Sequence, residues 1–205
     1  MSYSGWGELT VPGEITGYRS WKPLMSQQIE PALCAYTQGY IWKPGLNVAE
    51  CLRGGTLYGY RPHRPMPSKD CTCGFYARSV DDDHGYNIGI FGVIKASGRV
   101  ILGATGFRAE FARIVALYSD TGYSAYLENH AVNSWTMTWR ETQLRCAARY
   151  GVPLFNNFQE AVEAFPPDDL SAFRKEPKPK TVECQPVSSS ATTVQLPGWP
   201  NGLII

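Results

Sequence analysis

The chain has 205 residues, of which 43% are hydrophobic and 18% are charged, and its formal net charge is +1. This length is sufficient for one domain with a hydrophobic core, and the ordinary composition excludes disorder of the whole chain. The near-neutral charge argues against a protein devoted to the nucleic-acid backbone, because such proteins usually carry a clear basic excess.

The N-terminal residues contain neither a basic segment nor an apolar segment of the kind that forms a secretory signal. No stretch of the chain is apolar over the length that crosses a bilayer. We therefore expect a cytoplasmic protein without a membrane partner. In a reducing compartment, the six cysteines are expected to be free, catalytic or metal-bound rather than paired in disulfides.

The first half of the chain predicts strands and one long loop. Residues 1–14 are punctuated by Gly, Ser and Pro and are predicted to be a lead-in. Aromatic-rich segments within residues 15–43 predict two strands joined by a polar turn. The second strand is expected to end at Pro44-Gly45, because proline has no N–H to donate and glycine turns the chain. Residues 53–70 contain three Gly and three Pro and are expected to be irregular.

The middle of the chain predicts further strands. Residues 88–93 and 99–102 are rich in Ile and Val, and the KASG sequence between them predicts a β-hairpin. Residues 107–117 fit both strand alternation and helical spacing. We predict a strand, because Thr-Gly pairs flank this segment and the preceding elements predict a β meander.

The last part of the chain predicts helices followed by a tail. Thr138 is a candidate N-cap, and Glu141 three residues later is typical of a capping box. Residues 139–150 are therefore predicted to form a helix, and residues 157–165 a second, shorter one. Residues 166–205 are rich in Pro and Ser and cannot bury enough apolar surface to fold alone, which predicts a flexible tail or docking arm.

Together these elements predict an α+β domain that is mainly β. We expect a small antiparallel sheet or a partly open barrel with a structural metal site and one or two C-terminal helices. The domain is assigned to residues 15–165, between the lead-in and the tail.

The metal site is predicted from Cys51, His63, Cys71 and Cys73. Thiolates and imidazole are ligands that zinc binds tetrahedrally. In an extended chain, residues i and i+2 point to the same face, so Cys71 and Cys73 converge. His63 lies in the proline-stiffened loop before this pair, and Cys51 ends the preceding segment. Four protein ligands leave no open position, which predicts a structural rather than a catalytic zinc.

Two alternatives to zinc stay open. An iron–sulfur cluster also uses thiolate ligands, although the single histidine favours zinc. Otherwise the cysteines are free and buried, and His63 faces solvent.

The remaining cysteines and histidines give weaker indications of a site. Cys34 and Cys146 are expected in the core. His84 follows three aspartates in what we interpret as a solvated acidic loop. His130 could pair with Cys146, but no nucleophile elbow or oxyanion motif accompanies them.

Several short motifs occur along the chain in a fixed order, among them Trp-Lys-Pro-Gly, Asp-Cys-Thr-Cys-Gly-Phe-Tyr-Ala and Gly-Phe-Arg-Ala-Glu-Phe-Ala. With these motifs the chain resembles, over residues 18–154, a family of small Cys/His-containing β-rich proteins from actinobacteria and their phages. The resemblance implies one domain with the four ligands in one site, and the place of Cys51 in that site rests partly on it. It implies no reaction.

The Gly-Phe-Arg-Ala-Glu motif places Arg108 and Glu110 on one face of the predicted strand. We favour an ion pair between them that fixes the hairpin. The alternative is a groove for an anionic ligand or partner, lined by Arg61, Arg64, Arg78, Arg108 and Arg113.

These observations favour a non-catalytic binding or regulatory protein, phage-encoded on the basis of the resemblance, that is stabilised by zinc and contacts another protein. The candidate interface aromatics are Trp6, Tyr58, Tyr60 and Trp199. One alternative is a nucleic-acid-binding β module, in which arginines contact phosphates and aromatics stack on bases. The second is an enzyme of unassigned class, with His84, His130 or Cys146 in its cleft. The oligomeric state is left open.

Overall fold

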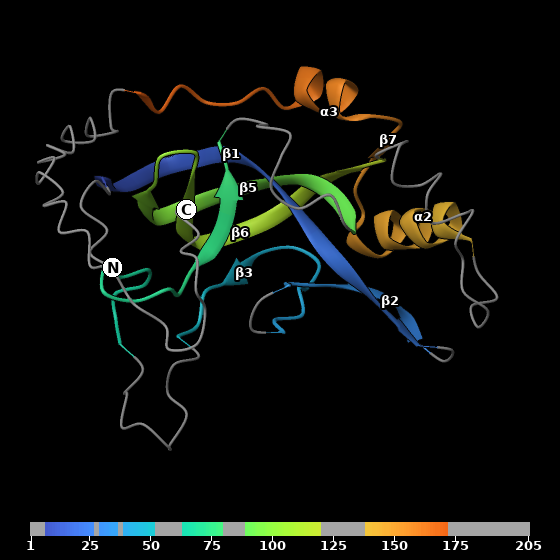
Figure 1. Ribbon diagram of the computed structural model, residues 1–205, viewed down its shortest axis with the longest axis horizontal. Helices are drawn as coiled ribbons and strands as arrows, with labels where there is room; N and C mark the ends of the chain where they lie inside the picture. Colours follow the sequence, from blue (N-terminus) through green and yellow to red (C-terminus); the bar gives the residue numbers. More distant parts are fainter. Residues whose placement is uncertain are drawn as a thin grey trace, which may run out of the picture.

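A computed structural model describes residues 7–26, 29–36, 39–51, 63–79, 89–119 and 138–171 (Figure 1). Its strands are β1 (Gly7–Ser26), β2 (Ile29–Cys34), β3 (Asn47–Val48), β4 (Phe75–Arg78), β5 (Ile90–Leu102), β6 (Gly106–Tyr118) and β7 (Leu154–Phe155). Its helices are α2 (Trp139–Tyr150) and α3 (Phe158–Ala164). The described part of the chain is therefore mainly β with two helices, which confirms the predicted fold class.

Four strands close into a ring-like arrangement. β1 pairs antiparallel with β5, from Gly7 opposite Leu102 to Trp21 opposite Ile90. β5 pairs antiparallel with β6, and β6 pairs with β4. The pairing of Tyr18 with Arg78 joins β4 back to β1 and completes the circle. This is the partly open barrel among the predicted architectures.

The predicted hairpin over residues 88–102 is wrong, because KASG lies inside a single strand, β5. Gly98 has a positive φ of 76°, and the register with β6 shifts between Ser97 and Val100. A side chain at this glycine would collide with the Phe111 ring. Glycine therefore allows a bulge that bends the strand without reversing it. The chain reverses between β5 and β6 instead, and the strand predicted for residues 107–117 is confirmed as β6.

Both ends of the described chain lie against the ring. β1 begins at Gly7, within the segment that we interpreted as a lead-in, and pairs with β5 from its first residue. At the other end, the Asp168 carboxylate accepts a hydrogen bond of 2.6 Å from the Thr16 N–H, and Leu170 is buried in the core. The first residues of the predicted tail or docking arm therefore contact the domain.

An apolar core fills the ring and continues under α2. Its fully buried side chains include Trp21, Trp42 and Leu117. The Thr138 hydroxyl accepts from the Glu141 N–H at the start of α2, so the predicted N-cap is confirmed. α3 covers a second apolar cluster on the same sheet. In the part of the chain that the structure describes, no helix is long and apolar enough to cross a membrane.

Candidate metal centre

The register of the sheet brings the predicted ligands together. One edge of β6 pairs with β5, so β4 and β3 must follow one another along the other edge, opposite residues 106–109 and 111–112. Both run antiparallel to β6, and β3 therefore ends where β4 begins. The chain continues from β3 to Cys51 and enters β4 from Cys73. Two segments that are distant in the sequence thus meet beside one short stretch of β6.

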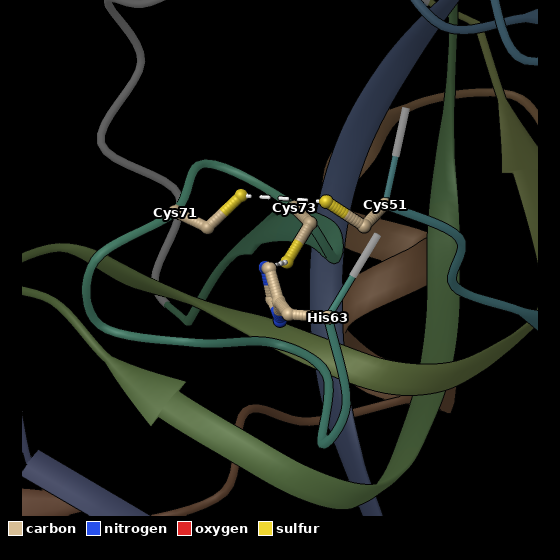
Figure 2. Close-up of side chains that lie close together, drawn as sticks. All are labelled: Cys51, His63, Cys71 and Cys73. Atoms are coloured by element: carbon tan, nitrogen blue, oxygen red, sulfur yellow. Dashed lines mark hydrogen bonds between the residues drawn. The ribbon is translucent and has the colours of Figure 1, made fainter. Parts of the chain in front are cut away.

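The four side chains converge on one point (Figure 2). Their ligand atoms all lie within 4.8 Å of one another. The Cys51 and Cys71 sulfurs are 3.7 Å apart, and the Cys73 sulfur is 3.5 Å from His63 Nε2. Tetrahedral zinc, with bonds of about 2.3 Å to sulfur and about 2.0 Å to nitrogen, implies separations of about 3.8 Å and about 3.5 Å. These two separations match a four-coordinate zinc site, and the group of four residues could hold a metal ion.

The orientation of His63 is also that of a ligand. Its Nδ1 lies 3.3 Å from the Pro65 carbonyl oxygen, while its Nε2 faces the Cys73 sulfur. A metal-bound histidine usually donates its second N–H to a carbonyl or carboxylate, which fixes the tautomer and the plane of the ring. We therefore assign Nε2 as the metal-binding atom.

A buried guanidinium holds the two-cysteine segment in place. Arg108 extends from β6 and is only 3% exposed. Its Nη1 donates to the carbonyl oxygens of Cys71 and Cys73, and its Nη2 donates to the Ser68 carbonyl oxygen at 3.2 Å. One side chain thus orients the backbone of both Cys71 and Cys73. Hydrogen bonds from a charged donor are stronger than neutral ones, particularly where water is excluded.

The residues next to the two cysteines complete this support. The Tyr76 hydroxyl donates to the Thr72 carbonyl oxygen at 2.9 Å, while the Thr72 side chain is exposed, as the alternation predicted. Gly74 has a positive φ of 110°, and a Cβ there would lie 3.0 Å from the Pro67 Cβ. The sheet therefore fixes the segment through its carbonyl groups and through a position that favours glycine.

The pKa values of the neighbouring Cys71 and Cys73 thiols show that the two do not ionise together easily without a cation. Burial opposes ionisation of Cys71, but hydrogen bonds from His63, the Cys73 backbone and Cys51 lower its pKa to about 7. Burial and the neighbouring cysteines raise the pKa of Cys73 to about 11. A divalent cation removes this conflict, because a coordinated thiol loses its proton.

Arg108 and Glu110, which we predicted to pair, have other partners. The Arg108 guanidinium donates to the cysteine segment, and the Glu110 carboxylate accepts from the Arg99 N–H at 3.2 Å. Sequence reasoning identified Arg108 as notable but missed its role, as it missed that of Tyr76. No local signal indicated the burial of Arg108, because a charged residue that alternates with apolar residues in a strand normally faces solvent.

The arginines proposed to form a groove have different environments. Arg113 forms a two-bond ion pair with Glu14, which raises the pKa of Arg113 and lowers that of Glu14. Arg64 is exposed, Arg78 is partly exposed on β4, and Arg108 is buried. Arg61 lies outside the described residues. Arg108 and Arg113 are thus bonded to other groups of the domain, which argues against an anion groove that all five arginines line.

Cys34 and Cys146 are buried in the core, as predicted. Burial raises the pKa of the Cys146 thiol to about 12, so it is a poor nucleophile. The other side chains singled out from the sequence, His84, His130, Trp6, Tyr58, Tyr60 and Trp199, lie outside the described residues.

No protein-family model, curated protein or solved structure matches the chain. The chemistry of the cluster therefore has to be inferred from its own geometry.

Proposed function

We propose that the chain is a non-catalytic binding protein and that the Cys51, His63, Cys71 and Cys73 cluster holds one structural zinc ion. The observation that carries the proposal is the convergence of four soft or borderline ligand atoms within 4.8 Å of one another, with a sulfur–sulfur and a sulfur–nitrogen separation that match tetrahedral zinc. Three sulfurs and one imidazole favour zinc over hard cations such as magnesium or calcium. The four protein ligands leave no coordination position for a substrate.

The zinc would connect the parts of the sheet with the least backbone pairing. β3 has 2 residues and β4 has 4, and both lie on the same edge of β6. Such short strands add little stability of their own. A metal ion that joins Cys51 to Cys71, 20 residues later, closes the intervening loop and fixes both strands at once.

Elemental analysis of protein purified without a histidine tag tests the metal. We expect about one zinc per chain. A chelator should remove this zinc, and the three ligand thiols should react with a thiol reagent only after its removal. Absence of both zinc and iron, with every thiol reactive in the folded protein, would contradict the proposal. Iron in place of zinc would retain the site and change the metal.

We extend the proposal to a protein partner that contacts the surface next to the cluster. Ile41, Leu46 and Val48 are 49%, 58% and 48% exposed, and Val48 lies on β3, which runs toward Cys51. Leu46 and Val48 lie two residues apart in the chain, and exposed apolar side chains close together are typical of protein interfaces. The resemblance to actinobacterial and phage proteins favours a bacterial cytoplasm as the place of action.

The partner is tested by affinity capture from the source cells with the wild type and with Leu46→Asp/Val48→Asp. We expect the double variant to lose a captured protein while it retains its zinc. Leu144→Asp is the matched control, because Leu144 is 51% exposed on α2. Equal capture by all three proteins would place the contact elsewhere or exclude it.

A further inference from the structure

Two of the three cysteines in the cluster form a pair of their own. The Cys51 and Cys71 side chains come from different segments and point toward one another (Figure 2), and their sulfurs are 3.7 Å apart. The Cys73 sulfur instead lies 3.5 Å from His63 Nε2. A disulfide bond is about 2.05 Å long, so the paired sulfurs need to approach by only about 1.7 Å to form one.

The backbone near this pair allows one partner to move toward the other. Arg108 donates to the carbonyl oxygens of both Cys71 and Cys73, so it holds these two cysteines in place. Cys51 lies two residues beyond Ala49, whose N–H donates to a β6 carbonyl oxygen at 2.8 Å. In the described chain, no later backbone hydrogen bond joins the Cys51 segment to β6. Cys51 is therefore the sulfur that can approach.

The pair also lies nearer to solvent than the other described cysteines. Cys51 and Cys71 are 9% and 7% exposed, whereas every other described cysteine is at most 3% exposed. Their neighbours in the chain, Glu50, Asp70 and Thr72, are exposed. The pair thus lies just below the surface, where an oxidant as small as hydrogen peroxide needs no cavity to reach the sulfurs.

We propose that the metal centre is a redox switch, in which hydrogen peroxide or another small hydroperoxide joins Cys51 to Cys71 in a disulfide and thereby expels the zinc. This inference rests on the proposed structural zinc and adds a way of regulating it. After oxidation only His63 and Cys73 remain as protein ligands, and two ligands are too few to hold a structural zinc.

The reaction balances with the peroxide as its only oxidant. One thiolate sulfur attacks a peroxide oxygen, the O–O bond breaks, and a sulfenic acid and a hydroxide form. The second thiolate attacks that sulfur, forms the S–S bond and expels a second hydroxide. The two sulfurs together lose two electrons, which reduce the peroxide, and two protons convert the two hydroxides to water. A dithiol reductant reverses the step and lets zinc bind again.

The disulfide retains one of the connections that the zinc makes. Cys51 and Cys71 are 20 residues apart, and a bond between them closes the same loop that the metal closes. β3 and β4 therefore stay linked after oxidation, while His63 is released from the corner. We expect the oxidised domain to remain folded.

The test starts from the reduced, zinc-loaded full chain, whose zinc content is measured first. Hydrogen peroxide is added in steps, and a chromophoric chelator reports the released zinc. Disulfides are mapped by mass spectrometry after the free thiols are alkylated. We expect about one zinc released per disulfide formed, a linkage between Cys51 and Cys71, and reduced thiols at Cys34 and Cys146. Dithiothreitol and added zinc should then restore the zinc content.

A variant separates the disulfide from other oxidative damage. Cys51→His keeps four possible zinc ligands but lacks one thiol of the pair, so we expect peroxide to release its zinc at least about tenfold more slowly. Cys34→Ser is the matched control, because Cys34 is buried outside the cluster. It should release zinc at the wild-type rate. If Cys51→His binds no zinc, the disulfide map of the wild type still decides the question.

The outcomes distinguish this inference from the proposed function. A zinc-loaded wild type that keeps its zinc under peroxide, or loses it without a disulfide between Cys51 and Cys71, contradicts the switch and leaves the structural zinc standing. Equal release rates from the wild type and Cys51→His also contradict the switch. Untreated protein that contains no metal contradicts the proposed function itself, and the switch with it.

Discussion

The ring of β1, β4, β5 and β6 differs in how it is stabilised from the cysteine corner, which consists of β3, the start of β4 and the four ligands. β5 and β6 have 13 residues each, pair along most of that length, and enclose fully buried side chains such as Ile94 and Leu117. At the corner, β3 has 2 residues and β4 has 4, and the cluster of buried cysteines packs against Met66. The ring is thus stabilised by backbone pairing and apolar burial, and the corner by four ligands and one guanidinium.

This difference shows where a metal is useful in a domain that already has a core. Two short strands along one edge of β6 bury too little apolar surface to fix the loop between them. Coordinating side chains supply a strong, directional connection without additional apolar volume. The corner is therefore expected to depend on zinc, while the ring is expected to depend on packing.

The largest expected effect comes from breaking the corner at its centre. Cys71→Ser removes one of three thiolates, and we expect loss of bound zinc and a fall in the free energy of unfolding of more than about 4 kcal/mol. Denaturant unfolding together with zinc analysis of the same sample measures both.

Cys34→Ser is the matched control for that change. Cys34 is also buried, but its thiol donates to the neighbouring Ala35 carbonyl oxygen, away from the cluster. We expect a loss of about 1 kcal/mol and full zinc content. Equal effects of the two substitutions would mean that the cluster contributes no more than ordinary core cysteines do.

The second effect should appear in the ring. Leu117→Ala truncates a fully buried side chain on β6 and should lower the free energy of unfolding by about 3 kcal/mol, through lost burial and the cavity left behind. Zinc content should stay at its wild-type value under conditions where the protein is folded. Leu144→Ala on the exposed face of α2 should cost less than about 0.5 kcal/mol. Zinc loss in the folded Leu117 variant would show that ring and corner are coupled.

The third effect concerns the support of the corner rather than its ligands. Arg108→Gln removes hydrogen bonds to the carbonyl oxygens of Cys71 and Cys73, so we expect zinc affinity to fall by about 10- to 100-fold. Competition with a chromophoric chelator measures this affinity. Arg113→Gln, which breaks an exposed ion pair with Glu14, should leave zinc affinity unchanged and cost less than about 1 kcal/mol. Unchanged zinc affinity in the Arg108 variant would mean that Arg108 does not position the zinc ligands.

Local signals in the sequence predicted β6 correctly, but they predicted neither the full extent of β1 and β5 nor the closure of the ring. Alternation and turn residues predicted β6, and Thr138 predicted the start of α2. KASG was misread as a turn, because one glycine serves a bulge as well as a reversal. The return of β4 to β1 depends on one pair, Tyr18 with Arg78, between segments far apart in the sequence. Short-range sequence patterns do not predict a pairing between such distant segments.

The ligands were predictable for a different reason. The spacing of Cys71 and Cys73 in an extended chain makes them converge whatever the rest of the fold does. Arg108 was harder, because its partners depend on which loop folds over that face of β6. Its apolar neighbours in the strand point to the opposite face, so the alternation reveals neither its burial nor its acceptors.

The smallest expected effect tests whether the shape of the corner matters as much as its ligands. Gly74→Ala places a methyl group where φ is 110° and where it would lie 3.0 Å from the Pro67 Cβ, so the cysteine segment has to shift. We expect a loss of about 2 kcal/mol and weaker zinc binding. Gly45→Ala is the control, because Gly45 also has a positive φ of 78° but would meet nothing within 4 Å. It should cost about 1 kcal/mol and leave zinc affinity unchanged, since its strain is confined to an open turn. Equal effects of the two variants on zinc affinity would mean that close packing against β6 does not position the thiols, and that the ligands alone define the corner.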